Sequence, residues 1–396
     1  MQLVAYGAQD VYLTGNPQIT FFKVVYRRHT NFSMESIEQT FNGTVAAGNK
    51  VPATISRNGD LIHRCYVQMK VTAAKVGDAV DGTQVAQNAD NVGHAALAEV
   101  EVEIGGQRID KHYSQWLDVW ADLTVPSGKK NGYEIMVDSS DTLYVPLQFW
   151  FCRNPGLALP LIALQYHEVK INITFAAATV IGKGGAGAQP SGAGDNASIT
   201  SASLWVDYIY LDTDERRRFA QVSHEYLIEQ LQFTGVEKAK ANGSHRLNFN
   251  HPVKELIWVN NSHNTLASPT QDPVTNWNTH VAVGDCKLQL NGHDRMAARD
   301  GSYFSLVQPY QHHTNVPASS ASSNINVYSF ALKPEDHQPS GTCNMSRIDN
   351  ATLHVTAMPD NGAVRPTGID KDLYIFAVNY NVLRIMGGMG GLAYSN

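Results

Sequence analysis

Histidine and cysteine are the residues of this sequence that could most readily do chemistry. Fifteen histidines are present, and His312 and His313 form the densest pair. Adjacent residues rarely supply two good ligands to one metal ion unless other imidazoles or carboxylates converge on it, and the spacing shows no such convergence. We therefore expect this pair to lie in a surface loop. His337 and Cys343 stand six residues apart in a segment rich in Pro, Ser and Gly, which does not predict a cysteine–histidine nucleophile.

A glycine-rich run at residues 182–187, GKGGAG, has the spacing of a dinucleotide-binding loop. Phosphate binding requires such a turn to open a helix, whose amides then meet the phosphate. Here the run continues into Pro190 and Gly192, so we predict a flexible surface loop over residues 182–198. No serine nucleophile elbow, P-loop or HExxH zinc motif occurs in the sequence. We expect no catalytic, no cofactor-binding and no metal-binding residue.

The cysteines and the glycosylation signals add little further chemistry. The four cysteines are Cys65, Cys152, Cys286 and Cys343. They form no CxxC pair, so we expect reduced, buried thiols in a protein made in the cytoplasm. Asn-X-Ser/Thr signals occur at Asn31, Asn42, Asn172, Asn196, Asn242, Asn260, Asn344 and Asn350. The first residues show no signal peptide, so we expect these signals to be incidental, with Asn196 the most accessible of them.

The composition is that of a globular protein with few charges. Hydrophobic residues make up 43% of the 396 residues, which permits sizeable cores and excludes global disorder. Charged residues are only 17%, which fits a protein that buries much of its surface against copies of itself and fits a secreted β-protein equally well. The net charge of −6 argues against nucleic-acid binding, and the short basic runs at residues 27–28 and 216–218 are expected to be solvated or salt-bridged. The most apolar stretch, residues 156–164, is about half the length that spans a membrane, so we expect a soluble protein.

Short runs rich in β-branched and aromatic residues, bounded by Gly, Asn, Asp and Pro, recur along the whole chain. Residues 99–104 alternate between glutamate and an apolar residue, as a half-buried strand does. The pattern predicts an all-β protein built of antiparallel sandwiches or barrels.

Only three short segments carry helical patterns. Their apolar faces would comprise Ile19, Phe22 and Val25; Trp116, Trp120 and Leu123; and Phe219, Val222 and Tyr226. Asp212 is a good N-cap for the third segment, and Glu215 follows it three residues on. Because this segment lies near mid-chain, we expect it to connect two domains.

Four matches between the two halves of the chain indicate a duplicated β-domain. Residues 58–62 resemble 253–257, residues 102–106 resemble 288–292, residues 171–174 resemble 353–356, and residues 206–211 resemble 378–383. The matches keep the same order, as expected if the second copy has shorter loops. We predict an N-terminal arm at residues 1–29, a first domain at 30–212, a connecting helix at 213–225, a second domain at 226–385, and a Gly-rich tail at 386–396. The tail is expected to be an unpacked arm.

Several long segments resemble the major capsid proteins of nucleocytoplasmic large DNA viruses, such as phycodnaviruses, iridoviruses and mimivirus-like viruses, with the closest likeness to the algal viruses. They are QLVAYGAQDVYLTGNP at residues 2–17, ITFFKVVYRRHTNF at 19–32, ISRNGDL at 55–61, NHPVKELIWV at 250–259 and FALKPEDHQPSGTCN at 330–344. The resemblance covers essentially the whole chain.

The resemblance implies two tandem eight-stranded jelly rolls with a few short helices, and a structural protein of the virion rather than an enzyme. It implies a homotrimer with a nearly hexagonal outline that contacts neighbouring capsomers in an icosahedral shell, minor capsid proteins and the side of an internal membrane. Synthesis in the host cytoplasm is expected, and cofactors and direct binding of nucleic acid are not. The residues alone leave one alternative open, a two-domain β-sandwich carbohydrate-binding protein or glycosidase with aromatic residues beside paired carboxylates.

Overall fold

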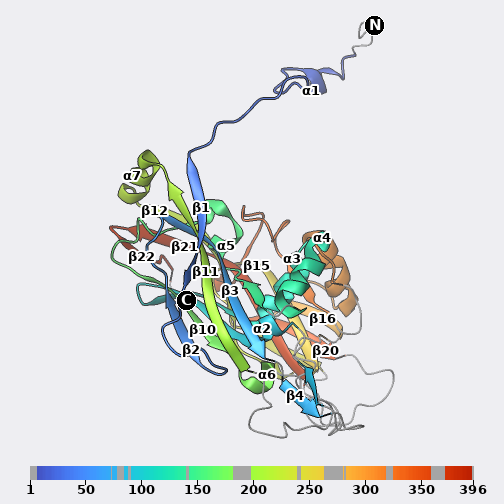
Figure 1. The fold of residues 1–396 in the computed structure, drawn as a ribbon. Coiled ribbons are helices and arrows are strands. Elements are labelled where there is room, and N and C mark those ends of the chain that lie inside the picture. Colours follow the sequence, from blue (N-terminus) through green and yellow to red (C-terminus); the bar gives the residue numbers. More distant parts are fainter. Residues whose placement is uncertain are drawn as a thin grey trace.

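The computed structural model describes the chain from the N-terminal arm to the C-terminal hairpin (Figure 1). The described residues are 7–72, 74–77, 84–87, 91–139, 142–181, 198–238, 242–262, 280, 282–317, 324–357 and 371–394. The glycine-rich run at residues 182–187 and the signal at Asn196 lie outside them.

The first half of the chain forms two facing antiparallel sheets. Their strands are β1 (Phe32–Gln39), β2 (Lys50–Thr54), β3 (Leu61–Thr72), β6 (Leu97–Ile104), β7 (Gln107–Tyr113), β8 (Leu143–Pro146), β10 (Val169–Phe175) and β11 (Ser198–Leu211). The sheet orders are β1-β11-β3-β8 and β2-β10-β6-β7. Three smaller strands complete this half, with β9 (Leu159–Pro160) on β3 and a separate hairpin of β4 (Ala74–Gly77) and β5 (Gln84–Gln87).

The second half repeats this arrangement. Its strands are β12 (His224–Phe233), β14 (Asn242–Leu247), β15 (Pro252–Ser262), β16 (Val283–Leu290), β17 (His293–Asp294), β18 (Asn326–Ser329), β20 (Ala351–Ala357) and β21 (Lys371–Met386). The sheet orders are β12-β21-β15-β18 and β14-β20-β16-β17. The short strands β13 (Glu237–Lys238) and β22 (Met389–Leu392) pair with β21, and β19 (Cys343–Asn344) pairs with β15. The prediction of two tandem eight-stranded jelly rolls is confirmed.

The internal matches of the sequence fall on equivalent strands of the two jelly rolls. They relate β3 to β15, β6 to β16, β10 to β20 and β11 to β21. The last pair of strands does not keep the residue-by-residue match. Leu61 and Leu256 are matched in the sequence, but Leu61 pairs with Ile209 whereas Leu256 pairs with Ala377, which is not the residue matched to Ile209. The duplication therefore holds for the strands, and bulges shift the register within them.

The apolar residues of the alternating strand β6 lie in the core of the first jelly roll. Val100, Val102 and Ile104 are fully buried between its sheets, as predicted. Glu101, on the opposite face of the strand, is also buried, and its carboxylate lies 2.6 Å from the ammonium of Lys50. Burial disfavours the charged carboxylate, but the neighbouring cations outweigh it and lower the pKa of Glu101.

Short helices lie in the connections between the strands. They are α1 (Val11–Thr14), α2 (Val92–Ala96), α3 (Ser114–Thr124), α4 (Ser127–Glu134), α5 (Trp150–Arg153), α6 (Ala178–Ile181), α7 (Thr213–Gln221) and α8 (Gln308–His312), the π-helical turns Ile135–Ser139 and Tyr303–Val307, and the 3-10 turns Pro155–Leu157 and Met345–Arg347. None of the helices in the described part of the chain is long and apolar enough to cross a membrane.

Helix α3 joins the two jelly rolls, and its predicted apolar face is confirmed. Trp116, Trp120 and Leu123 are buried with Val119 against the outer face of the sheet β12-β21-β15-β18. The strands of that sheet are apolar on both faces, because one face packs on the core of the second jelly roll and the other packs under α3.

The connecting helix is shorter than predicted. Helix α7 ends at Gln221, so Val222 and Tyr226 lie outside it, and β12 begins at His224. Asp212 is the N-cap residue by position, but its side chain makes no capping hydrogen bond. Val222 has an extended backbone, and Tyr226 pairs with Leu383 of β21, so strand pairing takes the residues that helical spacing assigned to α7.

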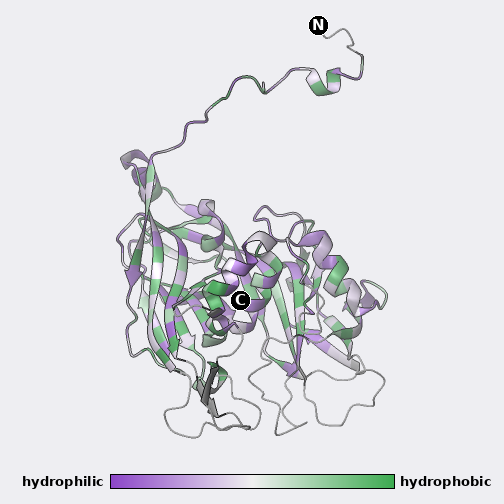
Figure 2. Cartoon of the chain, turned by 45° about the vertical axis from the view of Figure 1, so that its right-hand side comes forward, coloured by the Kyte–Doolittle hydropathy of each residue, from purple (hydrophilic) through white to green (hydrophobic). Residues whose placement is uncertain are grey.

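The predicted helix over Ile19, Phe22 and Val25 is wrong. These side chains are 71%, 98% and 78% exposed on a segment without regular structure, and the helical turn of this region is α1. Figures 1 and 2 show the arm projecting away from both jelly rolls. A short amphipathic segment needs a packing surface to become helical, and the chain offers it none here.

The prediction that the Gly-rich tail is an unpacked arm is also wrong. Strand β22 folds back on β21 through a turn in which Gly387 and Gly388 have positive φ. Gly390 is buried on the first jelly roll, where an added Cβ would lie 2.7 Å from the side chain of Leu164. The glycines permit a close approach, and His167 Nδ1 lies 3.0 Å from the carbonyl oxygen of Gly390.

Candidate functional site

The histidine pair singled out in the sequence lies at the end of α8, and only His312 is near the surface. The side chain of His313 is fully buried, so its predicted place in a surface loop is wrong. Its Nε2 lies 3.0 Å from Oε2 of Glu255, and its Nδ1 lies 2.9 Å from Oε1 of Glu335. Burial opposes the imidazolium, but the two carboxylates prevail and raise the pKa of His313 to about 9. The ring is therefore a buried cation held between two anions.

A second buried ion cluster joins the two jelly rolls. Glu229 of β12 lies 2.9 Å from the ammonium of Lys254 on β15 and 2.9 Å from the guanidinium of Arg153 on α5. Lys254 is fully buried, and His337 lies at the edge of the cluster, with Nδ1 3.7 Å from Oε1 of Glu229. Burial opposes ionisation of Glu229, but its partners outweigh burial and lower its pKa to about 2. The paired charges fix how α5 of the first jelly roll sits on the second.

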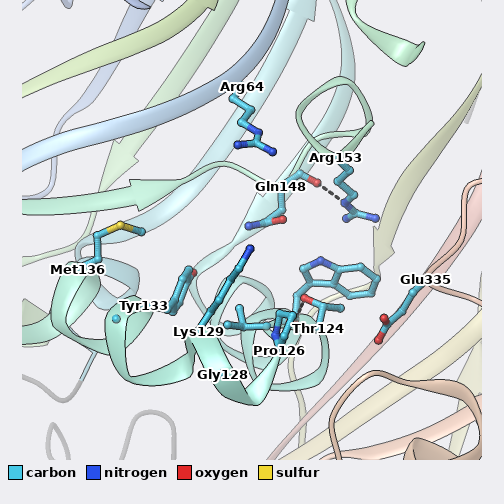
Figure 3. Close-up of a pocket in the computed structure, with 13 residues that line it drawn as sticks. Arg64, Thr124, Pro126, Gly128, Lys129, Tyr133, Met136, Gln148, Arg153 and Glu335 are labelled. Carbon is cyan, nitrogen blue, oxygen red and sulfur yellow. Dashed lines mark hydrogen bonds between the residues drawn. The ribbon is translucent and has the colours of Figure 1, made fainter. Parts of the chain in front are cut away.

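A cavity of about 760 Å³ opens beside these clusters, between α4, the end of α3 and the loop before α5 (Figure 3). Arg64, Lys129 and Arg153 bring three cations to its wall. The guanidinium of Arg153 lies 4.3 Å from the ring centre of Trp120, and its Nε donates a hydrogen bond to the carbonyl oxygen of Gln148. Glu335 is the carboxylate among the described lining residues, so this wall does not present the pair of acids that glycoside hydrolysis uses.

The other candidate residues are taken up in local structure. His337 faces Glu229 rather than Cys343, and Cys343 lies in β19 beside β15. Cys65, Cys152 and Cys286 are buried thiols, and burial raises the pKa of Cys286 to about 12. Within the described residues, no group of three or more His, Cys, Asp or Glu side chains is placed to hold a metal ion.

The basic runs and the glycosylation signals have mixed surroundings. Arg216 donates from Nε to the carboxylate of Asp60 at 2.7 Å, so the run that contains it is partly salt-bridged. Asn260 is 1% exposed in β15, and Asn172 lies within β10, where its amide donates to Glu103. The buried Asn260 cannot carry a glycan on the folded chain, and Asn172 is half-buried in mid-strand with its amide already hydrogen-bonded.

Sequence reasoning missed the buried ion pairs, although β15 carried a signal for them. Lys254 and Glu255 stand side by side within the apolar run VKELIWV, and both are fully buried. Two charges inside a strand that is apolar on both sides require partners, because a buried charge without a partner is costly. The identity of those partners, from α5, α8 and the loop that contains Glu335, depends on the tertiary fold.

The chain matches two family models that together cover both jelly rolls. Residues 20–212 match the model described as major capsid protein N-terminus, and residues 215–391 match that of the large eukaryotic DNA virus major capsid protein. The major capsid protein of Pyramimonas orientalis virus is 57% identical over 430 aligned residues, covering 100% of this chain and 99% of that protein. That of Paramecium bursaria Chlorella virus 1 is 48% identical with the same coverage.

Solved structures agree with these matches. The crystal structure of PBCV-1 VP54, fitted into a reconstruction of the virophage Sputnik, superposes with a TM-score of 0.80 at 42% identity, covering 95% of this chain and 100% of that one. The Faustovirus major capsid protein has the same fold, with a TM-score of 0.76 at 14% identity over 96% of this chain and 94% of that one.

The relatives are structural capsid proteins, so the alternative of a carbohydrate-binding protein or glycosidase is not favoured, and the chain is not an enzyme. The structure and the sequence comparisons agree. The chain has two jelly rolls with one strand order and buried charges between them, and its similarity to algal virus proteins extends over its full length. The chain belongs to the family of major capsid proteins of large eukaryotic DNA viruses.

Proposed function

We propose that three copies of the chain close into a trimeric capsomer of nearly hexagonal outline, and that these capsomers tile the icosahedral shell of a large DNA virus. The observation that carries the proposal is the repetition of one eight-stranded jelly roll within each chain. Three chains then supply six similar blocks around a threefold axis. Each chain must present two different complementary faces, a heterologous contact that closes after three steps.

The proposed division of the chain follows the same logic. The strands support a first block within residues 30–212 and a second within residues 226–385, with the intervening residues 213–225 as the connection. The buried ion pair of Arg153 with Glu229 and the apolar face of α3 hold the two blocks as one unit. A rigid pair of blocks suits a lattice, because a fixed angle between them sets the outline of the capsomer.

We propose that the N-terminal arm, residues 1–29, anchors the capsomer on the inner side of the shell. Its described part is exposed and rich in apolar side chains, with Phe21 87% and Phe22 98% exposed. Exposed apolar side chains of this kind mark a surface that binds a partner. We propose that the partner is a neighbouring capsomer, a minor capsid protein or the side of an internal membrane. The proposed work needs no catalytic, cofactor or metal site and no direct contact with nucleic acid, in keeping with the net charge of −6. Synthesis in the host cytoplasm precedes incorporation into the virion.

Light scattering on the full chain as it leaves a sizing column tests the trimer. A stable species of about 130 kDa, three times 43.4 kDa, is expected, and imaging of that species should show pseudo-hexagonal particles. A monomer of 43.4 kDa that persists as concentration rises would overturn the proposed closed trimer.

A further inference from the structure

The outer face of the second jelly roll is covered by the chain itself. Phe376, Ile257 and Val327 form one row across β21, β15 and β18, and all three side chains are buried. Helix α3 covers this row, and the rings of Trp116 and Phe376 lie 5.3 Å apart. An apolar row on the outside of a sheet is thus matched by the helix that connects β7 to β8.

The first jelly roll carries the corresponding row on its own outer face. Trp205, Tyr66 and Pro146 pair in the same way across β11, β3 and β8. These three residues are only half-buried, and neighbouring Tyr144 is 37% exposed. The ring of Tyr66 lies 6.3 Å from that of Trp205 and 6.2 Å from that of Tyr144, so these three rings form a continuous aromatic surface along the row. Its counterpart is covered by a helix, whereas this surface remains open in the single chain.

The second jelly roll also has a counterpart of α3. The π-helical turn Tyr303–Val307 and α8 form one helical run that connects β17 to β18, as α3 connects β7 to β8. Phe304 anchors its inner side in the core at 1% exposure. Leu306, Val307 and Tyr310 are 36%, 40% and 79% exposed, at the three- and four-residue spacing of one helical face. This face has no cover within the described chain comparable to the sheet under α3.

We propose that residues 303–312 of one copy pack on the outer face of the sheet β1-β11-β3-β8 of the next copy, as α3 packs on β12-β21-β15-β18 within the chain. Each copy supplies one open helical face and one open aromatic row, so contacts are satisfied in equal number around a closed ring. This inference rests on the proposed trimer and names its subunit interface. A second copy is the occupant because the chain itself contains the pairing of a helix with the equivalent sheet face.

Exposed tyrosines on the two faces allow a test in the full chain. Tyr310→Asp places a charge on the helical face, Tyr144→Asp places one beside the aromatic row, and Tyr166→Asp, at a residue 76% exposed elsewhere, is the matched control. Thermal unfolding identifies variants that fail to fold. At equal concentration, the wild type and the control are expected near 130 kDa and the two interface variants near 43 kDa.

Photo-crosslinking keeps the inference testable if single charges are tolerated. A benzophenone side chain at position 310 should crosslink to β3, β8 or β11 of another copy, with mixed isotope-labelled chains proving that the link is between copies. A trimeric wild type whose crosslinks map elsewhere, or whose interface variants remain trimeric like the control, overturns this interface and leaves the trimer standing. A wild-type chain that is monomeric overturns both.

Discussion

Because the imidazolium of His313 is buried between carboxylates, we expect the folded chain to lose stability as the pH becomes alkaline. The pKa of His313 is raised from an ordinary value of 6.5 to about 9 by the carboxylates of Glu255 and Glu335. A raised pKa means that the folded chain binds the proton more tightly than the unfolded chain does. The contribution to stability is therefore fully present below pH 6.5 and is lost as the pH rises through about 9.

The size of this contribution follows from the shift. Each unit of pKa corresponds to about 1.4 kcal/mol, so the proton on His313 contributes about 3 kcal/mol in acid, and about 2.5 kcal/mol of this should disappear between pH 7 and pH 10. The side chain is fully buried, so solvent screening does not reduce the figure substantially.

The assay compares the pH dependence of the unfolding free energy in the wild type and in the double variant Glu255→Gln, His313→Gln. The double variant removes the two fully buried charges, whereas His313→Gln alone would leave the carboxylate of Glu255 buried without its cation. At one fixed protein concentration, denaturant titrations should show the wild type losing about 2.5 kcal/mol relative to the double variant between pH 7 and pH 10. Parallel curves for the two proteins would refute a protonated His313 in the folded chain.

Three further changes test the packing and the second ion cluster. Trp116→Ala should lower the unfolding free energy by about 3–5 kcal/mol in denaturant titrations, whereas Tyr26→Ala, on the exposed arm, should change it by less than about 0.5 kcal/mol. Gly390→Val should lower the midpoint of thermal unfolding, because its Cβ would lie 2.7 Å from a leucine, while Gly128→Ala, with open space around it, should not. Glu229→Gln should cost about 3–5 kcal/mol at pH 7, because it leaves a buried lysine and an arginine without their carboxylate. An equally stable Glu229 variant would show that the cluster contributes nothing.

The strands could be predicted because their signal is local. Alternation with a period of two in β6 depends only on neighbouring residues, and the repeated order of matched segments indicated a duplicated β-domain. The assignment of that domain as an eight-stranded jelly roll rested on the family resemblance. The apolar face of α3, like the alternation in β6, was recognised from a local pattern. Its role was not, because the surface that it covers lies in β15 and β21, more than a hundred residues further along the chain.

The wrong predictions share one cause, which is that the deciding contact is distant in sequence. Ile19 and Phe22 have helical spacing but no surface to pack on, so the segment stays irregular. Glycines suggested a loose tail, yet Gly390 is needed for close contact with the first jelly roll. His313 looked like a loop residue until the fold brought Glu255 and Glu335 to either side of it.

The two jelly rolls share a strand order but differ in what covers their outer faces, and this difference accounts for a closed assembly better than exact repetition would. If each jelly roll covered its own outer face, the chain would have no apolar surface with which to find a partner. If neither face were covered within the chain, the two blocks would be held at no fixed angle, and three chains could join in many ways.

The helix α3 and the ion pair of Arg153 with Glu229 fix one junction inside the chain. The open row around Tyr66 and the open face of residues 303–312 leave the equivalent junction to be made between chains. Alternation of an internal with an external junction yields six blocks from three chains.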